Sequence, residues 1–342
     1  MKDNRFITLA FESSCDETAV AVVADGRQVL ANVISSQIEI FKNYGGVVPE
    51  IAARHHLENI NYVLDQALAE ASLTLDDVDL IGVTEGPGLV GALLIGVATA
   101  KAVAFARDLP LVGVHHIMGH IAANYIQFPA LEPPFTALIV SGGHTNIADV
   151  DSYTTCRILG STRDDAVGEA YDKVARVLGL GYPGGPKIDA LASEGDPQAV
   201  HFKRVYLEKD SYDFSFSGLK TAVLNHLNSA RQKGEEINRA DIAASFQQAV
   251  LEVICDKAIK AAVELGYGKL VLAGGVAANS ALRRELGARC AEKGLELFIP
   301  SPALCTDNGA MIACAAYYKY KEGKTADLYM DAHASLPFAE KK

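Results

Sequence analysis

The chain has 342 residues, of which 49% are hydrophobic and 21% charged, a composition typical of globular proteins and unlike that of disordered chains. Its formal net charge of −11 at pH 7 argues against a generic nucleic-acid-binding surface, since phosphate contacts require local lysine and arginine. The length predicts two domains.

The cysteines and the apolar segments bear on the cellular compartment of the protein. Six cysteines are scattered along the chain without a C-x-x-C pair, which argues against a zinc ribbon or a thioredoxin-like site and favours a reducing environment. The first residues contain no long apolar stretch, so we expect no signal peptide. The longest apolar region, Leu89–Ala106, is interrupted by Gly91, Gly96 and Lys101, and we predict a buried helix there, not a membrane span. These features predict a cytoplasmic protein without a membrane segment.

The first part of the chain alternates strand and helix patterns. Three short apolar runs separated by polar turns predict a meander of strands, which helical periodicity follows. The predicted strands are Phe6–Ala10, Thr18–Val23, Val29–Ile34, Leu80–Thr84 and Leu111–Val114, and the predicted helices are Glu50–Ala71 and Leu89–Ala106.

The pattern then restarts with a second hairpin, Phe135–Val140 and Thr145–Val150, around a polar glycine-rich turn. Two hairpins with polar turns indicate an internal duplication. Strands that alternate with helices predict an α/β fold. We expect an N-terminal lobe of residues 1–128, joined by the C-terminal helix 308–322, and a C-terminal lobe of residues 129–307. The remaining predicted elements are the helices Ala166–Leu178, Leu219–Gln232, Asp241–Leu265, Ala278–Lys293 and Asn308–Tyr320, and the strand Lys269–Ala273.

His116 and His120 are four residues apart, so a helix would place both rings on one face at metal-ligand spacing. On spacing alone, a ligand pair and two hydrogen-bonded core histidines are equally supported. A zinc peptidase of the H-E-x-x-H type also needs a glutamate after the first histidine, and Ile117 stands there. Asp307 is a candidate third ligand, or else the N-cap of the last helix. Two histidines and one carboxylate suit iron or zinc.

Two glycine-rich segments are candidates for nucleotide contact. Ser141-Gly142-Gly143 joins two strands, where backbone N–H groups could approach phosphate oxygens. Gly274–Asn279 follows a strand and begins a helix, where the backbone could pass under a base. Tight turns with close packing explain both segments equally well.

Several acids are candidates for substrate contact. Asp172 and Asp189 could accept hydrogen bonds from ribose hydroxyls, although each carboxylate alone is more often solvated. Between them, Gly184-Gly185-Pro186 predicts a specially shaped loop. Asp16 and Glu17 lie in the first hairpin turn, where they could face a substrate or cap backbone groups.

Taken together, nine segments in one order resemble the bacterial members of the universal tRNA threonylcarbamoyladenosine synthesis transferase family, formerly described as sialoglycoproteases. They are Glu12–Thr18 (ESSCDET), Val47–Arg54 (VVPEIAAR), Glu85–Gly91 (EGPGLVG), His115–His120 (HHIMGH), Ser141–Thr145 (SGGHT), Gly184–Asp189 (GGPKID), Phe214–Thr221 (FSFSGLKT), Gly274–Asn279 (GGVAAN) and Thr306–Gly309 (TDNG).

The resemblance implies a two-lobed fold of the actin/Hsp70/sugar-kinase type, with a ribonuclease-H-like core in each lobe. It implies transfer of a threonylcarbamoyl group from threonylcarbamoyl-adenylate to the exocyclic N6 amine of the adenosine 3′-adjacent to the anticodon, in tRNAs that read codons beginning with A. AMP is released. An adenine nucleotide and a metal ion would then share one cleft.

The resemblance also assigns residues and partners. One divalent metal, with Fe(II) favoured over zinc, would bind His116, His120 and Asp307. Asp16 or Glu17 is the candidate to relay the amine proton. The implied partners are tRNA, a smaller non-catalytic paralogue that docks on the N-terminal lobe, and a P-loop ATPase. The implied donor-binding residues are Ile139, Val140, Ser141, Gly142, Gly143, Asp172, Gly185, Asp189 and Asn279.

Three other functions fit part of the pattern. An ATP-dependent phosphotransferase of the same fold leaves the histidine pair unused, and a metallopeptidase lacks its glutamate. A non-catalytic nucleotide-binding scaffold would not need to keep all of these ligand and loop motifs. For RNA contact, the best local basic group is Lys203, Arg204, Lys220, Arg231 and Lys233, although each alone reads as a solvated helix residue.

Overall fold

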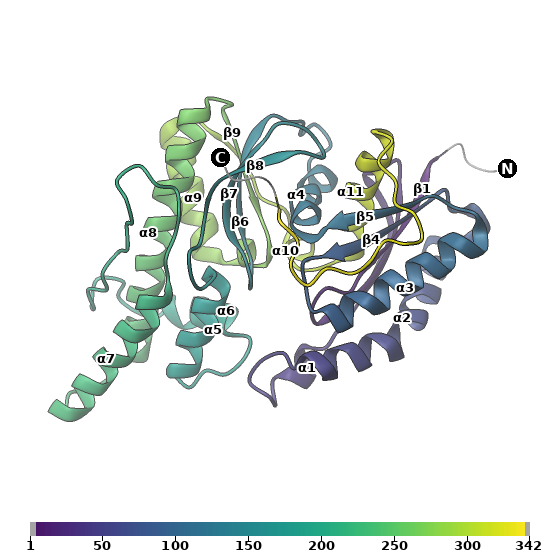
Figure 1. The fold of residues 1–342 in the computed structure, drawn as a ribbon. Coiled ribbons are helices and arrows are strands. Elements are labelled where there is room, and N and C mark those ends of the chain that lie inside the picture. The colour runs from purple at the N-terminus through teal and green to yellow at the C-terminus, as the bar shows by residue number, and fades with distance from the viewer. Residues whose placement is uncertain (1–4, 339–342) are drawn as a thin grey trace. The chain divides into compact units, whose positions relative to one another are not determined.

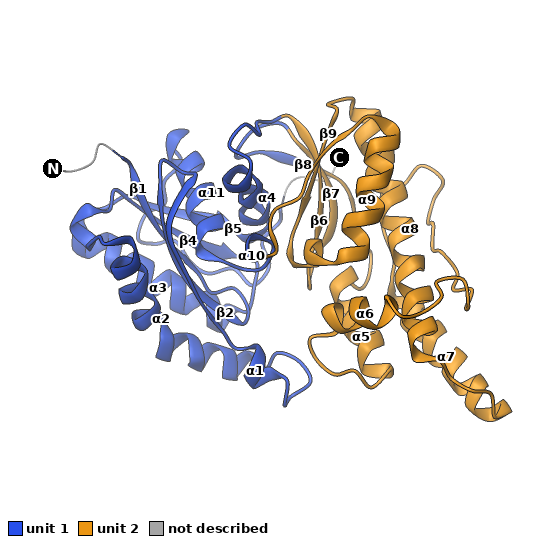
Figure 2. Cartoon of the chain, turned by 180° about the vertical axis from the view of Figure 1, so that it is seen from behind, with its two compact units in different colours: residues 1–133, 151–156, 303–340 blue, residues 134–150, 157–302, 341–342 orange. Residues whose placement is uncertain are grey.

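The computed structural model describes residues 5–338, which form two compact units (Figure 2). Unit 1 contains the described residues up to Pro133, the segment Asp151–Cys156 and the described residues from Ala303 on; unit 2 contains Pro134–Val150 and Arg157–Pro302. The predicted division, after residues 128 and 307, has no counterpart to the segment Asp151–Cys156.

Unit 1 is built on a five-stranded mixed sheet (Figure 1). The first strand pairs antiparallel with the second and parallel with the fourth, so the hairpin and the βαβ connection extend the sheet in opposite directions. Across the sheet the order is β3 (Gln28–Ser36), β2 (Glu17–Ala24), β1 (Ile7–Glu12), β4 (Leu80–Gly86) and β5 (Leu111–His115).

Helices cover both faces of this sheet. α2 (Pro49–Ala71) and α3 (Val90–Arg107) pack on one face, where their apolar side chains meet Leu9, Phe11 and Val20 in a buried cluster. α11 (Gly309–Lys321) packs on the other face together with α4 (His116–Gln127). Because both faces are covered, the side chains of β1 are buried on both sides. Each fully buried aliphatic side chain contributes about 1.5–3 kcal/mol to folding.

Arg27, in the turn between β2 and β3, ties together distant segments of unit 1. Its guanidinium lies 5.5 to 5.7 Å from the ring centroids of Tyr125, Tyr153 and Tyr318. It also donates to the carbonyl oxygens of Pro129 and Leu131. A single side chain therefore holds the short segment Asp151–Cys156 and the end of the first 133 residues against the body of unit 1.

Unit 2 repeats the same strand order. Its first hairpin, β6 (Phe135–Val140) and β7 (Thr145–Val150), is antiparallel, and β9 (Lys269–Ala273) pairs parallel with β6 on the other side. The full order is β10 (Glu296–Phe298), β9, β6, β7 and β8 (Cys156–Ser161). In each sheet the order is therefore third, second, first, fourth and fifth strand, which confirms the predicted internal duplication.

The helices of unit 2 support this sheet and its loops. The longest, α8 (Arg239–Leu265), packs on β6, β7 and β9, and its first turn is capped by the side chain of Asn238. The others are α5 (Val167–Val177), α6 (Gly184–Ala192), α7 (Ser217–Lys233) and α9 (Ser280–Lys293), and short elements α1 (Ile38–Phe41) and α10 (Pro302–Cys305) complete the chain.

The predicted loop at Gly184-Gly185-Pro186 is wrong, because these residues form the first turn of α6. A proline is tolerated there, since the first N–H groups of a helix have no intrahelical partner. The N–H of Gly184 instead donates to Asp172 Oδ1 at 2.7 Å. This tertiary contact could not be predicted from the local sequence. Strands β8 and β10 were also not predicted.

Among the described helices, α3 alone is long and apolar enough to cross a membrane by length and composition. Its inner side is buried, with Leu93, Val97 and Ala100 packed toward the sheet. Its outer side is not, because Val90, Leu94 and Phe105 are 49%, 46% and 74% exposed. The prediction of a buried helix is therefore right for one side of α3 and wrong for the other.

Replacing Gly274 with alanine should destabilise unit 2. Gly274 has φ of +92°, and an added Cβ would lie 2.4 Å from the carbonyl oxygen of Val140. Backbone strain of this kind costs about 1–3 kcal/mol before any steric adjustment. Urea unfolding followed by circular dichroism should show this loss, whereas Gly287→Ala, in the open interior of α9, should not lower stability.

Candidate functional site

The two predicted metal-ligand histidines lie in the first two turns of α4, as their spacing predicts. Both rings are buried, and their centroids are 4.6 Å apart. His115 fixes the start of this helix: its Nδ1 accepts from the N–H of Ile117 and its Nε2 donates to the carbonyl of Leu336. Between the ligands, Gly119 lets α11 approach, since a Cβ there would meet Ile312 at 2.7 Å.

Asp307 completes a three-residue cluster within unit 1. Its Oδ1 is 3.5 Å from His116 Nε2 and 3.2 Å from His120 Nε2. Two ligands bound to one metal at about 2.1 Å with tetrahedral angles are about 3.4 Å apart, which these distances match. The alternative that Asp307 caps the last helix is wrong, because the side chain of Asn308 accepts from the N–H of Met311 and forms that cap.

His120 gives an independent test of whether a cation fits. Both of its ring nitrogens are buried, and in the described part of the chain neither makes a hydrogen bond; Nε2 has only the contact with Asp307 Oδ1 at 3.2 Å. A buried polar group without a partner costs free energy, roughly 1–3 kcal/mol by mutational measures. A metal ion bound at Nε2, beside the Asp307 carboxylate, would satisfy one of these nitrogens. The donor set thus fits a divalent cation that accepts two imidazoles and one carboxylate.

The first hairpin turn adds carboxylates to the same region. Burial opposes the charge on His116, but the carboxylates of Asp307 and Glu12 outweigh it and raise the pKa of His116 to about 9. Burial, followed by the charges of Asp307 and Asp16, raises the pKa of Glu17 to about 10. Without a cation, Glu17 is therefore protonated at neutral pH. Asp16 is almost fully buried beside it.

Neighbouring helices hold this turn in place. His56 on α2 is fully buried; its Nε2 lies 2.9 Å from the carbonyl of Cys15 and its Nδ1 2.7 Å from Thr18 Oγ1. A carbonyl only accepts, so Nε2 carries a proton and donates. From α3, the carbonyl of Ala92 accepts from Ser13 Oγ at 3.0 Å. The turn that carries Asp16 and Glu17 is thus rigidly tied to α2 and α3.

Unit 2 contains a cavity of about 530 Å³, a size suited to a nucleotide. Gly142, Gly185 and Gly275 line it, and a Cβ at any of them would meet no atom within 4 Å. None has a left-handed backbone, so neither strain nor packing within the chain requires glycine there. Without side chains, these three positions leave the backbone open to close approach by a ligand.

Two predicted carboxylates line this cavity. Asp172 Oδ1 accepts from the N–H of Gly184, and Asp189 Oδ2 accepts from the N–H of Ser280. The other oxygen of Asp189 is buried without a partner in the described residues, as expected for a group that accepts from a ribose hydroxyl. Asn279 also lines the cavity, but its side chain is occupied by Gln247 and by the N–H of Leu282.

Four predicted donor-binding residues do not line the cavity. The side chains of Ile139 and Val140 are fully buried in β6, so only their backbone could face a ligand. Ser141 Oγ accepts from the N–H of His144 within the turn, and Gly143 lies next to it. The cavity is also lined by Val276, which lies within the predicted segment Gly274–Asn279. The sequence analysis did not single out Tyr171, Tyr182 and Ser193, which line it too, because no local pattern marks these positions as neighbours in space.

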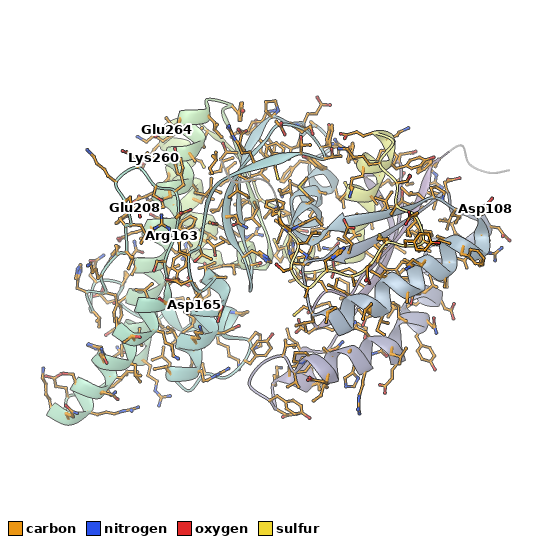
Figure 3. The ribbon with its side chains drawn as sticks, in the orientation of Figure 1. Asp108, Arg163, Asp165, Glu208, Lys260 and Glu264 are labelled. Carbon is orange, nitrogen blue, oxygen red and sulfur yellow. The ribbon has the colours of Figure 1, made fainter. Side chains whose placement is uncertain are left out.

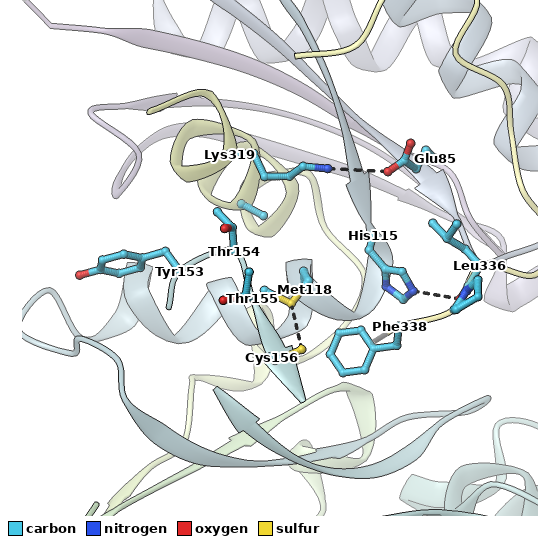
Figure 4. Close-up of a pocket in the computed structure, with 12 residues that line it drawn as sticks. Glu85, His115, Met118, Tyr153, Thr154, Thr155, Cys156, Lys319, Leu336 and Phe338 are labelled. Atoms are coloured by element: carbon cyan, nitrogen blue, oxygen red, sulfur yellow. Dashed lines mark hydrogen bonds and ion pairs between the residues drawn. The ribbon is translucent and has the colours of Figure 1, made fainter. Parts of the chain in front are cut away.

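A second cavity, of about 330 Å³, lies in unit 1 beside the start of α4 (Figure 4). His115 and Phe338 face each other across it with ring centroids 5.0 Å apart, and Cys156 Sγ lies 3.7 Å from Met118 Sδ. Lys319 and Glu85 form an ion pair at its far side. These lining groups therefore contact one another within unit 1.

The fold alone defines a class of protein. The chain superposes with a TM-score of 0.63 on the HypF structure determined in a phosphate- and nucleotide-bound form, at 16% identity over 93% of this chain and 46% of that one. It superposes with a TM-score of 0.53 on component A of the (R)-2-hydroxyglutaryl-CoA dehydratase of Acidaminococcus fermentans, at 17% identity over 93% and 98%. The duplicated sheets place the chain in this actin-like class of α/β folds.

The sequence comparisons identify the family within that class. The sequence profile of tRNA N6-adenosine threonylcarbamoyltransferases matches residues 28–314. The enzyme of that name from Moorella thermoacetica is 59% identical over 96% of both chains, and that from Clostridioides difficile is 56% identical over 96% of this chain and 98% of its own. The chain belongs to the tRNA N6-adenosine threonylcarbamoyltransferase family and is a transferase. The shared cleft for nucleotide and metal stays a prediction.

Replacing Gly275 with alanine should weaken nucleotide binding without destabilising the fold. The added methyl group would project into the open space of the cavity and occupy the place of the ligand. We expect at least a tenfold loss of affinity for AMP by calorimetric titration, with an unchanged melting temperature. The matched control is Gly287→Ala, outside the cavity; if both variants bind AMP like the parent chain, Gly275 does not contact the nucleotide.

Proposed function

We propose that this chain transfers the threonylcarbamoyl group of threonylcarbamoyl-adenylate to the N6 amine of the adenosine 3′-adjacent to the anticodon, in tRNAs that read codons beginning with A. The new bond joins N6 to the carbamoyl carbon, the bond from that carbon to the phosphate oxygen breaks, and AMP leaves with the electron pair. The observation that carries this proposal is a nucleotide-sized cavity and a two-histidine, one-carboxylate cluster in a chain 59% identical to a relative of that name.

The nucleotide cavity of unit 2 would hold the AMP part of the donor. Asp189 offers a buried carboxylate oxygen to a ribose hydroxyl, and Asp172 fixes the start of α6. Gly142 and Gly275 allow the backbone to approach the phosphate and the base. Since a carbamoyl–phosphate anhydride is already activated, orientation of the donor is the main task of this cavity.

The cluster of unit 1 would hold one divalent metal, with Fe(II) favoured and zinc possible by its ligand set. When bound, the metal would act as a Lewis acid toward oxygens of the donor. His116, His120 and Asp307 leave room for such an oxygen, because three protein ligands do not fill a coordination sphere of four or more.

The amine must lose a proton as the new bond forms, and Asp16 and Glu17 are the predicted acceptors. The raised pKa of Glu17 makes it a poor acceptor until a cation offsets the charge of Asp307. We therefore assign the proton to Asp16, whose backbone carbonyl is fixed by the N–H of Gln37.

The outer side of α3 is the surface that we assign to the smaller non-catalytic paralogue. Val90, Leu94 and Phe105 expose an apolar stripe there, and Leu57 and Tyr62 are 63% and 75% exposed on the neighbouring α2. A helix that is apolar on both sides is normally covered on both sides. A partner helix laid along α3 would provide the second cover.

For tRNA we propose the outer face of α7. The ion pairs of Arg163 with Glu208 and of Lys260 with Glu264 neutralise other cations of unit 2 (Figure 3). Arg204 is likewise bound through two bonds to Glu252, which removes it from the predicted basic group. Lys233, near the end of α7, pairs with Glu235 at 3.7 Å, and Lys203 is exposed outside that helix. Lys220 and Arg231 are eleven residues apart and so lie on one side of α7.

The assay for this function combines the chain, its paralogue, a P-loop ATPase partner, threonylcarbamoyl-adenylate and unmodified tRNA, with nucleoside analysis by mass spectrometry. We expect threonylcarbamoyladenosine and AMP in equal amounts. His120→Ala should reduce bound metal from one ion per chain to almost none and lower product formation at least a hundredfold. The control His201→Ala changes an exposed histidine of unit 2 and should do neither. Absence of the modified nucleoside with the parent chain rejects the proposed activity.

Replacing Leu94 with glutamate should impair docking of the paralogue. A charge placed in the centre of the apolar stripe would have to be desolvated, so we expect at least a tenfold weaker affinity by calorimetry. Val263→Glu is the matched control, since Val263 is 51% exposed on α8 of unit 2. If both variants bind the paralogue with equal affinity, α3 is not the docking surface.

A further inference from the structure

Glu12, at the end of β1, is a buried carboxylate that the proposed reaction leaves unused. It is 1% exposed, and three donors converge on it. Oε1 accepts from the N–H of Ser14 at 2.6 Å, and Oε2 accepts from Thr84 Oγ1 at 2.6 Å. Nδ1 of His116 lies 3.1 Å from the same Oε2. Because a carboxylate oxygen has two acceptor sites, Oε2 can serve both Thr84 and His116.

This contact decides which nitrogen of His116 carries a proton. A carboxylate only accepts, so a hydrogen bond to Oε2 requires a proton on Nδ1. Nε2, which faces Asp307 Oδ1 at 3.5 Å, is then the nitrogen that can give up its proton and bind a metal. The opposite tautomer would place two lone pairs face to face at Glu12 and a proton where the metal should bind.

Ser14 is a second possible partner of His116 Nδ1, and it could favour the other tautomer. Its hydroxyl oxygen lies 3.2 Å from Nδ1 of His116, and a hydroxyl can either donate or accept. Without Glu12, the Ser14 hydroxyl could donate to Nδ1 and stabilise the tautomer that cannot bind metal. A carboxylate removes this ambiguity, since it has no proton to give.

We propose that Glu12 is a positioning residue that holds His116 in the Nδ1–H tautomer and aims Nε2 at the metal. The inference rests on the metal site of the proposed function. Glu12 would contact the metal ligand His116 and would not bind the metal itself. Loss of such an outer partner typically lowers metal affinity 10- to 100-fold.

The test measures zinc affinity of the purified full chain by competition with a chromophoric chelator. Glu12→Gln retains the shape of the side chain but turns one acceptor into a donor, so one of the three donors loses its partner. We expect zinc affinity to fall about 10- to 100-fold. Nitrogen-15 NMR of the zinc-loaded parent chain should show His116 with a proton on Nδ1 and zinc on Nε2, and the variant should lose this protected proton.

Two matched variants separate positioning from general damage. Ser14→Ala removes the competing hydroxyl and Thr84→Val removes the second donor to Oε2, and both should bind zinc within threefold of the parent chain. If Glu12→Gln does not fold, Glu12→Asp keeps the charge but withdraws it from Nδ1 and should show the same loss. Zinc affinity of the Glu12 variant within threefold of the parent, zinc bound through Nδ1, or a parent chain that binds no zinc overturns the inference.

These measurements contain no tRNA, adenylate or partner protein. A chain that binds zinc as expected but makes no threonylcarbamoyladenosine would reject the proposed function and leave the role of Glu12 standing. If the parent chain makes the nucleoside but Glu12→Gln binds zinc as tightly as the parent, the role of Glu12 is rejected and the proposed function stands.

Discussion

The crowding and mutual repulsion of partly buried carboxylates is the constraint on which the rest of unit 1 depends. Asp16, Glu17 and Asp307 come from the first hairpin and from the segment before the last helix. Burial, followed by the charges of Asp307 and Asp16, raises the pKa of Glu17 far above its usual range. The chain could relieve this repulsion with a lysine or arginine, but it places two imidazoles there instead. An imidazole can lose its proton near neutral pH and then offer a lone pair to a metal, whereas an arginine stays protonated. The two histidines therefore leave open the metal site proposed above, which a lysine or arginine would close.

The duplicated sheet explains where the two candidate sites arise. In each unit the turn after the first strand is polar: Glu12–Thr18 leads into β2, and Ser141-Gly142-Gly143 leads into β7. One turn carries carboxylates that are fixed by α2 and α3, and the other carries glycines that leave the backbone bare. The same topological position therefore carries carboxylates in one unit and bare glycine backbone in the other.

Local patterns predicted most elements, because a hairpin, an amphipathic helix and the spacing of His116 and His120 depend on residues that are close in sequence. The remaining features depend on contacts between residues far apart in sequence. The start of α6 depends on a bond from Gly184 to Asp172, and the burial of Ile139 and Val140 depends on helices that follow much later. The role of Glu12 could not be read from its motif, since its contact with His116 joins residues 104 positions apart. The sequence left Asp307 as either a third ligand or the cap of the last helix, and the cap formed by Asn308 excludes the second alternative.

The two-sided apolarity of α3 has a consequence for how the chain must be produced. Val90, Leu94 and Phe105 stay in water for as long as no other molecule covers them. Contiguous apolar surface of this kind promotes self-association, and net charge of one sign counteracts it. The charge of −11 would then oppose self-association of chains whose α3 is uncovered. If the paralogue proposed above covers α3, matched synthesis of both proteins would keep this apolar surface from accumulating in uncovered copies.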